Sequence, residues 1–345
     1  MNIFTRIVLI LFCLSAGAQA SPADTTRLTV MFYNTDNLYD TENDPGVDDE
    51  EFLPSSGKLW DETRYMKKVE DVGKVLCSLP DVQLPDIVGV CEVENRKVLD
   101  DLTRVTCMAK GGYSFIHRDS PDKRGLDVAL LYRTSRFTPL KKVFIPSGLP
   151  SDTIPACDIL YVSGSADDGT ILHLFVNHWA SRENNVRGTE RRRLYAAVKL
   201  RKTVDSILNT EPLAQIIIMG DFNDEPTNMS LHSILNASNK RRNASGRDLY
   251  NLMYDRHNMN REGTYNHKGN WLMTDQIIVS QALLTGEEPW ITGYDDGRIL
   301  RHDWLLTDNP KVGMPVPNLT FSGNKYFGGP GDHLPVYVVL TRTIK

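Results

Sequence analysis

The chain of 345 residues has 41% hydrophobic and 24% charged residues, which excludes an intrinsically disordered protein and leaves enough apolar material for one large core. Its 39 basic and 44 acidic residues give a net charge of −5. Bulk charge therefore does not attract the chain to nucleic acid, and any phosphate group must be bound by local side chains.

The first twenty residues are expected to be a secretory signal. Arg6 precedes an apolar run from Ile7 to Leu14, and Ala18-Gln19-Ala20 places small residues at the spacing of a cleavage site. The apolar run is too short to span a bilayer as an anchor. We therefore expect an exported protein, periplasmic or extracellular, with no stable membrane anchor and a single domain over residues 21–345.

The N-terminal third of the chain alternates predicted strands and helices. Apolar runs predict strands at 27–34 and 86–91, and apolar residues at helical spacing predict helices at 61–79 and 95–106. Between the first strand and the first helix, an acidic run with Pro and Gly residues, 40–57, is predicted to be a solvated loop.

The middle of the chain is predicted to contain strands and one long helix. Strands are expected at 113–117, 126–132 and 170–176, and a helix at 189–208. The three arginines 191–193 on this helix are predicted to lie on a solvated face, with steering of a phosphate group as the alternative.

The C-terminal part is organised around a strand at 215–220, whose four consecutive apolar residues indicate burial on both faces. Residues 228–261 are polar and predict only a short helix near Leu231. A short strand is expected at 277–279, loops from 281 to 331, and a last strand at 336–340. One domain with many strands and external helices accounts for this pattern.

The cysteines do not predict a metal site. Cys77, Cys91, Cys107 and Cys157 lack the paired C-x-x-C spacing of a zinc site, and in an exported protein four cysteines allow three disulfide pairings. Cys91 lies inside an apolar strand and is expected to be a buried thiol.

Polar side chains gather at the ends of the predicted strands. Any one of them is an ordinary turn residue or hydrogen-bonded cap, but a carboxylate at the edge of a core is costly, and the repetition needs a common cause. A divalent cation that binds a phosphate group is such a cause, and oxygen ligands favour magnesium, manganese or calcium. The residues are Asn34 and Asp36, Glu92, Asn177 and His178, Asp221 and Asn223, Asp275, and Asp332 and His333.

The motif Gly220-Asp221-Phe222-Asn223, with Glu92 and His178 before it and Asp332-His333 after it, resembles the endonuclease/exonuclease/phosphatase (DNase I-like) superfamily. This superfamily includes pancreatic-type DNases, apurinic endonucleases, neutral sphingomyelinases and inositol polyphosphate 5-phosphatases. The resemblance covers residues 27–342, and the stretches 33–40, 92–95 and 124–132 are most similar to secreted bacterial nuclease-like members. It implies an α/β fold, a four-layer α/β/β/α sandwich of two packed β-sheets flanked by helices, with the active site among the loops at one end.

The resemblance also implies roles for individual residues. Glu92 matches the metal-binding glutamate, Asp332 matches a second acid beside the metal, and Asn34 and Asp36 would help to hold metal or phosphate. The implied ion is a divalent cation, with Mg²⁺ preferred and Mn²⁺ or Ca²⁺ as alternatives. Asn177, Arg124 and Asn37 are expected to contact the substrate.

The catalytic residues implied by the resemblance are His178, Asp221, Asn223, Asp275 and His333. Asp221 and Asn223 match the pair that orients the attacking water and the phosphate, and Asp275 matches the acid that fixes the tautomer of His333. Either Asp221 or His333 would accept the proton of the water, and His178 is the candidate acid for the leaving oxygen. Apurinic endonucleases carry tyrosine at the position of His178, which argues against repair of abasic sites.

These residues lead us to expect a metal-dependent phosphoric-ester hydrolase, preferably a monomeric endonuclease whose substrate is DNA or RNA. A phosphoesterase that acts on lipid head groups or inositol phosphates is the alternative. No exposed apolar hairpin supports the lipid substrate, and Tyr326-Phe327-Gly328-Gly329 is the nearest candidate. An exported binding protein without turnover is the third hypothesis.

Overall fold

The computed structural model describes residues 25–343 with the exception of 83, 105, 151–155 and 183–185. The expected secretory signal at 1–20 lies outside these residues. No helix in the described part of the chain is both long enough and apolar enough to cross a membrane.

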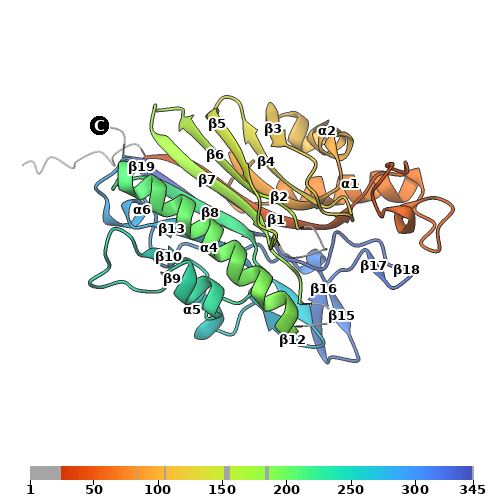
Figure 1. The fold of residues 1–345 in the computed structure, drawn as a ribbon. Coiled ribbons are helices and arrows are strands. Elements are labelled where there is room, and N and C mark those ends of the chain that lie inside the picture. Colours follow the sequence, from red (N-terminus) through yellow and green to blue (C-terminus); the bar gives the residue numbers. More distant parts are fainter. Residues whose placement is uncertain (1–24, 83, 105, 151–155, 183–185, 344–345) are drawn as a thin grey trace, which may run out of the picture.

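Two large β-sheets pack face to face (Figure 1). The first has the strand order β14-β19-β1-β2-β4-β3, and the second has the order β5-β6-β7-β8-β13-β10-β9. The strands of the first sheet are β1 (Thr25–Leu38), β2 (Ile87–Val93), β3 (Tyr113–His117), β4 (Asp127–Arg133), β14 (Arg298–Ile299) and β19 (Val336–Thr343). Those of the second are β5 (Phe137–Ile145), β6 (Ile159–Ala166), β7 (Ile171–His178), β8 (Gln215–Asp221), β9 (Ala237–Ser238), β10 (Leu249–Asn251) and β13 (Asp275–Ser280).

Helices cover the outer faces of both sheets. α1 (Glu62–Leu76) and α2 (Arg96–Arg104), together with the short α3 (Thr106–Ala109), pack on the first sheet, and α4 (Val186–Thr210) packs on the second (Figure 1). The two short helices α5 (Tyr254–Asn258) and α6 (Ala282–Thr285) lie near β10 and β13. The predicted four-layer α/β/β/α sandwich is confirmed.

The central strands are apolar on both faces because each sheet is covered on both sides. In β1, Val30 and Phe32 pack between the two sheets, whereas Met31 and Tyr33 pack beneath the helices of the first sheet. In β8, Met219 faces the other sheet, and Ile218 faces the α4 side. This double burial explains why these strands read as continuous apolar runs.

Other parts of the structure differ from the sequence predictions. β5 was not predicted, since most of its residues are exposed or only half-buried at the edge of the sheet and show no apolar run. β6 was also missed, although its first four residues are apolar and buried. The region 281–331 contains, beside α6 and β14, two antiparallel hairpins rather than loops alone. The hairpins outside the two sheets are β11 (Tyr265–His267) with β12 (Asn270–Leu272), β15 (Leu306–Asn309) with β16 (Met314–Pro317), and β17 (Phe321–Ser322) with β18 (Lys325–Tyr326).

One of the three arginines predicted to be solvated is buried. Arg193 is 1% exposed, and its Nε lies 2.8 Å from Asp224 Oδ1. Arg182 Nη2 donates to the same carboxylate oxygen at 2.9 Å and Arg182 Nε to the carbonyl of Asn223 at 2.8 Å. The two arginines therefore hold the loop that follows β8.

A disulfide joins Cys77, at the end of α1, to Cys107 in α3, while Cys91 and Cys157 are buried free thiols. The bridge closes a loop between residues 30 positions apart. Replacing both bridged cysteines by serine should lower the free energy of unfolding by about 2–4 kcal/mol, because the unfolded chain gains entropy. Urea unfolding measures this change. A reductant should destabilise the natural protein by the same amount and leave the double variant unaffected; equal sensitivity of the two would contradict a stabilising bridge.

Candidate active site

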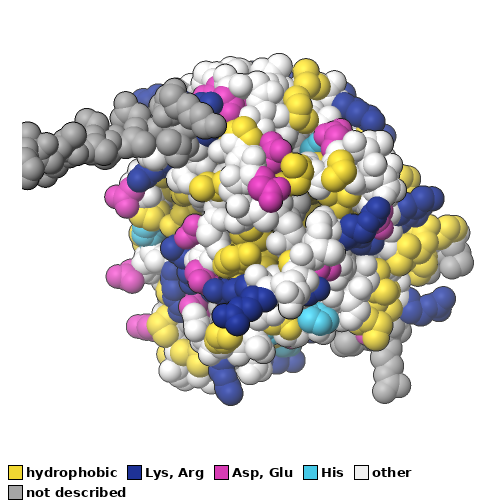
Figure 2. Space-filling view, turned by 90° about the vertical axis from the view of Figure 1, so that its left-hand side faces the viewer, with side chains coloured by type: hydrophobic (Ala, Val, Ile, Leu, Met, Phe, Trp, Pro, Cys, Tyr) yellow, Lys and Arg dark blue, Asp and Glu magenta, His cyan; other side chains and the backbone are white. Residues whose placement is uncertain are grey.

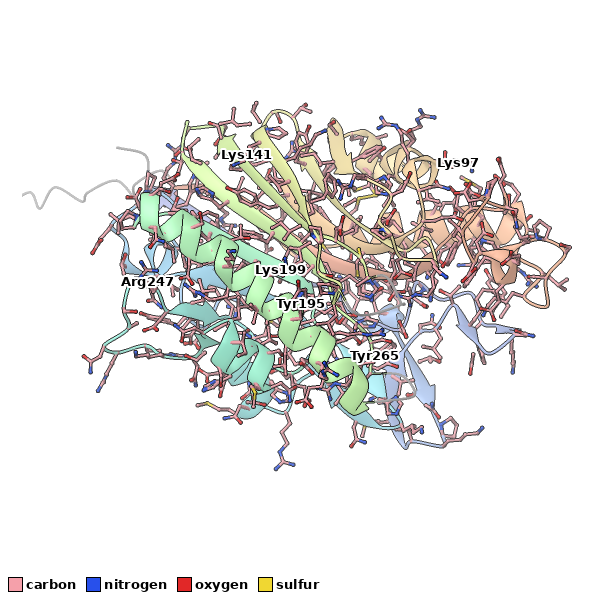
Figure 3. The ribbon with its side chains drawn as sticks, in the orientation of Figure 1. Lys97, Lys141, Tyr195, Lys199, Arg247 and Tyr265 are labelled. Carbon is pink, nitrogen blue, oxygen red and sulfur yellow. A yellow bond between two sulfur atoms is a disulfide. The ribbon has the colours of Figure 1, made fainter. Side chains whose placement is uncertain are left out.

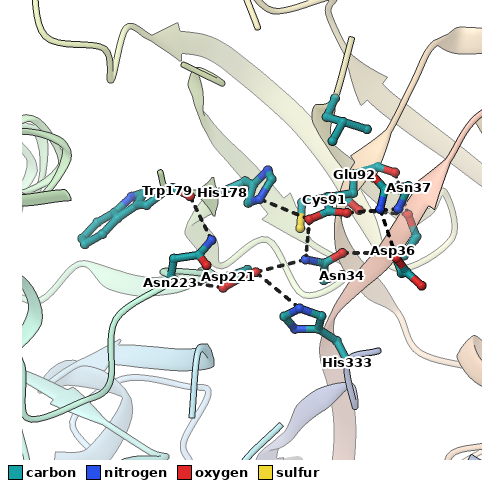
Figure 4. A network of polar contacts seen from close by, with 12 residues as sticks. Asn34, Asp36, Asn37, Cys91, Glu92, His178, Trp179, Asp221, Asn223 and His333 are labelled. Atoms are coloured by element: carbon teal, nitrogen blue, oxygen red, sulfur yellow. Dashed lines mark hydrogen bonds and ion pairs between the residues drawn. The ribbon is translucent and has the colours of Figure 1, made fainter. Parts of the chain in front are cut away.

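Strand direction brings the predicted site residues to one end of the sandwich. β1 and β2 run parallel, as do β7 and β8, so Asn34, Glu92, His178 and Asp221 lie at or near the carboxyl ends of their strands. β13 is antiparallel to β8, and therefore Asp275 stands opposite Asp221 at the start of its strand. Figure 4 shows side chains from both sheets meeting in one polar network.

β1 and β2 are irregular where they enter the site. The register between them shifts between Asn34 and Leu38, and the pairing of β2 with β4 shifts between Cys91 and Val93. Asp36, Asn37 and Glu92 have φ of 52°, 59° and 60°, in the left-handed region that a glutamate seldom adopts. Such bulges redirect side chains, and here they turn Asn34 and Glu92 into the same space.

Asn34 is the centre of the hydrogen-bond network. Its Nδ2 donates to Glu92 Oε1 and to Asp221 Oδ2, both at 3.0 Å, and its Oδ1 accepts the backbone N–H of Asp36 at 2.9 Å (Figure 4). Asn34 is completely buried. One amide thus fixes two carboxylates that come from different sheets.

Glu92 has further partners on both of its oxygens. Oε2 accepts the backbone N–H of Asn37 at 3.0 Å, and Oε1 lies 3.4 Å from His178 Nε2. Burial raises the pKa of Glu92, and the nearby charge of Asp36 adds to this. Burial favours the neutral form of His178 as well, which lowers its pKa to about 4, so its imidazole is neutral at pH 7.

His333 is held by an aspartate, as the resemblance implied. Its Nδ1 lies 2.7 Å from Asp275 Oδ2, and its Nε2 lies 3.8 Å from Asp221 Oδ2 and 3.7 Å from Asp332 Oδ1. Burial alone would lower the pKa of His333, but the carboxylates of Asp275, Asp332 and Asp221 outweigh it and raise the pKa well above its ordinary value. The ring of Tyr265 stacks on the imidazole at 4.8 Å between centroids.

Asp332 enters the site on a loop that passes close to Asp36. A Cβ at Gly331, which has φ of 151°, would lie 3.0 Å from the Cβ of Asp36. Partial burial and the charge of Asp36 raise the pKa of Asp332 to about 8. These acids repel one another, so the region as it stands favours binding of either protons or a cation.

Lys68 is a site residue that was not predicted. It comes from α1, its side chain is 1% exposed, and its Nζ lies 3.7 Å from Asp36 Oδ2. The same nitrogen donates to the carbonyl of Pro330 at 2.9 Å and to the hydroxyl of Thr320. Burial lowers the pKa of Lys68. The lysine therefore connects Asp36 with the loop that carries Asp332.

The remaining predicted residues lie around this centre in different ways. Asn223 Nδ2 donates to the carbonyl of Trp179, and its backbone N–H donates to Asp221 Oδ1. Asn177 is completely buried and uses its amide on the carbonyl of Met219 and on Trp179 Nε1, so these contacts lie within the protein, and its contact with substrate stays a prediction. Arg124 is exposed at the rim and paired with Asp122.

The donor set suits a divalent cation. Ligand atoms of Glu92, His178 and Asp221 lie within 4.8 Å of one another, as do those of Asp221, Asp275 and His333. Hard oxygen donors predominate, and His178 Nδ1 is buried without a hydrogen-bond partner among the described residues. Glu92, Asp36 and Asp332 are the oxygen donors whose mutual repulsion a cation would relieve.

Comparison with known proteins agrees with this geometry. A model of the Endonuclease/Exonuclease/phosphatase family matches residues 29–342. No curated protein sequence matches the chain.

Solved structures share the fold at low identity. A family protein from Bacteroides thetaiotaomicron has 18% identity and a TM-score of 0.55, and the match covers 93% of this chain and 100% of that one. D. rerio TDP2, complexed with single strand DNA product, has 16% identity and a TM-score of 0.54 over 91% of this chain and 99% of its own. The human Nocturnin catalytic domain, with bound sulfate anion, has 17% identity and a TM-score of 0.53 over 92% and 96%.

Proposed function

Because this chain belongs to the endonuclease/exonuclease/phosphatase family, we propose that it is an exported, metal-dependent phosphodiesterase, and specifically an endonuclease that hydrolyses DNA or RNA. The observation that carries the proposal is the Asn34 amide, which joins Glu92 and Asp221 next to His333. Hydrolysis of a phosphodiester requires acidic groups and an oriented imidazole. The acidic groups are Glu92 and Asp221, which the Asn34 amide holds together. The imidazole is that of His333, which Asp275 orients.

The cation would be held by Glu92, with Asp36 and Asp332 nearby, and Mg²⁺ is the ion we propose. When bound, it supplies positive charge to the nonbridging oxygens of the phosphate group. Asn34 orients Glu92 by a hydrogen bond at 3.0 Å. Lys68, 3.7 Å from Asp36, keeps that acid in place.

In the proposed reaction, Asp221 binds the attacking water and accepts its proton. Burial and the charge of Asp275 raise the pKa of Asp221, which makes it a stronger base than an ordinary aspartate. The water oxygen forms a bond to phosphorus while the bond to the leaving oxygen breaks. Asn34 and the backbone of Asn223 hold the two carboxylate oxygens of Asp221 in position.

His333 would donate from Nε2 to a phosphoryl oxygen and stabilise the negative charge that develops there. Asp275 keeps the imidazole oriented through its contact at 2.7 Å with Nδ1. His178, neutral at pH 7 with a pKa of about 4, would donate a hydrogen bond to the leaving oxygen, and that oxygen would take its proton from solvent water.

Two observations support a nucleic-acid substrate and export of the protein. The solved D. rerio TDP2 structure contains single strand DNA product, and that protein shares the fold. The disulfide between Cys77 and Cys107 fits an oxidising compartment, as the predicted secretory signal requires. We propose that the enzyme acts as a monomer.

Hydrolysis of lipid head groups or inositol phosphates is the second candidate. The observation in its favour is Phe327, which follows the β17–β18 hairpin and is 53% exposed. A single aromatic side chain, with Lys325 Nζ 4.8 Å from its ring centroid, is a small surface for a membrane.

Parallel assays distinguish these substrates. Purified protein with Mg²⁺, Mn²⁺ or Ca²⁺ would be tested on supercoiled plasmid, RNA, sphingomyelin vesicles and inositol polyphosphates, with EDTA as the control. We expect plasmid or RNA cleavage that EDTA stops and added metal restores. Lipid or inositol phosphate hydrolysis with intact nucleic acid would establish the second candidate, and inactivity on all four substrates would indicate a binding protein.

Replacing Glu92 by glutamine should weaken Mg²⁺ binding by about tenfold or more, since the carboxylate is the central predicted ligand. Calorimetric titration with Mg²⁺ measures the dissociation constant, and the matched variant Glu287→Gln, at an exposed position, should bind as the natural protein does. Unchanged binding in Glu92→Gln would remove Glu92 from the metal site.

A further inference from the structure

A buried carboxylate with no role in the proposed reaction follows directly after the site residue Asn223. Asp224 is 4% exposed, and withdrawing its charge from water is costly unless cations compensate for it. Two arginines do so: Arg182 Nη2 donates to Asp224 Oδ1 at 2.9 Å, and Arg193 Nε lies 2.8 Å from the same oxygen. The other oxygen, Oδ2, accepts the hydroxyl of Ser230 at 2.6 Å. Both oxygens of Asp224 are therefore occupied by the protein itself.

Arg182 joins the loop after β7 to the loop after β8. Its Nε donates to the carbonyl of Asn223 at 2.8 Å. Its Nη2 also donates to Asn228 Oδ1 at 2.7 Å, and that oxygen accepts the backbone N–H of Glu225 at 2.6 Å. Because the guanidinium is planar and carries several donors, one side chain can make all of these contacts at once. Arg182 therefore holds the beginning and the end of the loop 222–228.

Arg193 attaches α4 to the same two loops. Its side chain is 2% exposed, and its Nη1 donates to the carbonyl of Ala180, in the loop after β7, at 3.0 Å. Through Nε the same guanidinium pairs with Asp224 in the loop after β8. Figure 3 shows α4, marked by Tyr195 and Lys199, lying along the second sheet, to which β7 and β8 belong. The helix that covers this sheet therefore also fixes both loops.

The two loops start at proposed catalytic residues. β7 and β8 run side by side in parallel, so His178 stands beside Asp221 at their ends. The backbone N–H of Trp179 donates to the carbonyl of Asp221 at 2.9 Å, and the carbonyl of Trp179 accepts Asn223 Nδ2 at 3.0 Å (Figure 4). A shift of either loop would therefore change the distance between His178 and Asp221 and the orientation of Asn223.

Asn223 needs such support because its backbone is strained. Its φ of 50° lies in the left-handed region, which a residue with a side chain keeps only when its surroundings enforce it. Its backbone N–H donates to Asp221 Oδ1 at 2.9 Å, so this conformation orients the proposed base. From the β13 side, Gln276 Nε2 donates to the carbonyl of Asp224 at 2.7 Å. The residue after Asn223 is thus held both by its side chain and by its carbonyl.

We propose that Asp224 is a positioning residue of the proposed phosphodiesterase, and that it forms a clamp with Arg182 and Arg193. The clamp holds the loop after β8 so that Asp221 and Asn223 face the phosphate group, and this role rests on the proposed function. Asp224 is too deeply buried to contact a substrate, so it acts only through the residues that the loop carries. Since a displacement of about 1 Å can lower a rate by about a hundredfold, loss of the clamp should affect the chemical step.

The chain contains a matched control for this arrangement. Asp86, which is 5% exposed, also lies between two arginines, since its Oδ1 is 3.2 Å from Arg133 Nη1 and 3.2 Å from Arg136 Nε. It directly precedes β2, whereas Glu92 lies near the other end of that strand, so this second group is at the opposite end of the sandwich. Asp86→Asn therefore removes the same kind of buried charge without touching the site.

Asp224→Asn tests the proposal on the substrate that the parallel assays identify. We expect kcat to fall by about tenfold or more while KM and the Mg²⁺ dissociation constant stay within about twofold, because the substrate and metal contacts remain. Asp86→Asn should lower Tm to a similar extent but leave kcat unchanged. Equal kcat values in the two variants would overturn the positioning role alone. A natural protein that hydrolyses none of the substrates would contradict the proposed function itself and, with it, this role.

Arg182→Gln provides the test if Asp224→Asn does not fold. The Arg182 side chain is 30% exposed, so its loss is better tolerated, and kcat should fall by about tenfold. Arg133→Gln, at a side chain that is likewise 30% exposed, is the matched control and should leave kcat unchanged. Hydrogen exchange gives a measurement that does not depend on activity: the amides of the loop 222–228 should exchange faster in Arg182→Gln but not in Arg133→Gln. Equal exchange of this loop in the two variants would overturn the clamp.

Discussion

Asp221→Asn should lower the turnover of the natural phosphodiester by about a hundredfold or more while the fold persists. The asparagine has the same shape and can still accept the hydrogen bond from Asn34, now 3.0 Å from Asp221 Oδ2. What it loses is the ability to take the proton of the attacking water. Because the substrate contacts remain, the loss should appear in kcat rather than in KM.

The control for this variant is Asp308→Asn, an exposed aspartate outside the site, which should retain full activity. Circular dichroism and urea unfolding would show that Asp221→Asn is folded. Activity within a few-fold of the natural enzyme would exclude Asp221 as the base and leave His333 as the alternative.

His333→Ala should cause a loss of similar size, about a hundredfold or more. Its Nε2 is the imidazole nitrogen that faces Asp221 and Asp332, so the variant lacks the donor for the phosphoryl oxygen. The variant also leaves Asp275 buried without its partner at 2.7 Å, which should reduce stability.

Two comparisons separate catalysis from stability in this variant. His267→Ala, at an exposed histidine on β11, should behave as the natural protein. Added imidazole should restore part of the turnover of His333→Ala if the ring acts on the phosphate. Undiminished turnover in the alanine variant would refute the role of His333.

Most of the centre could be predicted because it depends on strand ends. Asn34, Glu92 and Asp221 each interrupt or end an apolar run, and the carboxyl ends of parallel strands meet at one edge. Asp275 and His333 lie at or before the start of their strands, β13 and β19. They reach the same end of the sandwich because these two strands run antiparallel to β8 and β1. The resemblance to the family added the pairing of Asp275 with His333. In the structure, Asp275 Oδ2 lies 2.7 Å from His333 Nδ1.

The residues whose burial was not predicted are basic residues with long side chains on helices. Lys68 lies between Tyr65 and Val72 on the buried face of α1, and Arg193 precedes Ala197 and Leu200 at the same helical spacing on α4. This spacing indicates burial, but lysine and arginine are ordinarily exposed to solvent. A buried lysine or arginine is stable only when an acidic partner pairs with its charge. The partners Asp36 and Asp224 lie far away in the sequence.

The acidic loop 40–57 is exposed or half-buried over most of its length, as predicted, but Asp40 and Asp49 within it are buried. A run rich in Asp, Glu, Gly and Pro is ordinarily exposed, and the burial of Asp40 and Asp49 depends on contacts with Glu94 and Asn95 after β2. No local pattern reports such contacts. Figure 2 shows the end of the molecule at the left of Figure 1, where Lys and Arg side chains are mixed with Asp and Glu, as the balanced composition leads one to expect.

A crystal structure of the protein grown with Mn²⁺, a substitute for Mg²⁺ that scatters anomalously, tests the metal site most directly. We expect an anomalous peak at bonding distance from the carboxylate of Glu92, on the side of Asp36 and Asp332. A metal-saturated crystal with no peak at Glu92 would contradict a metal-dependent centre in this pocket.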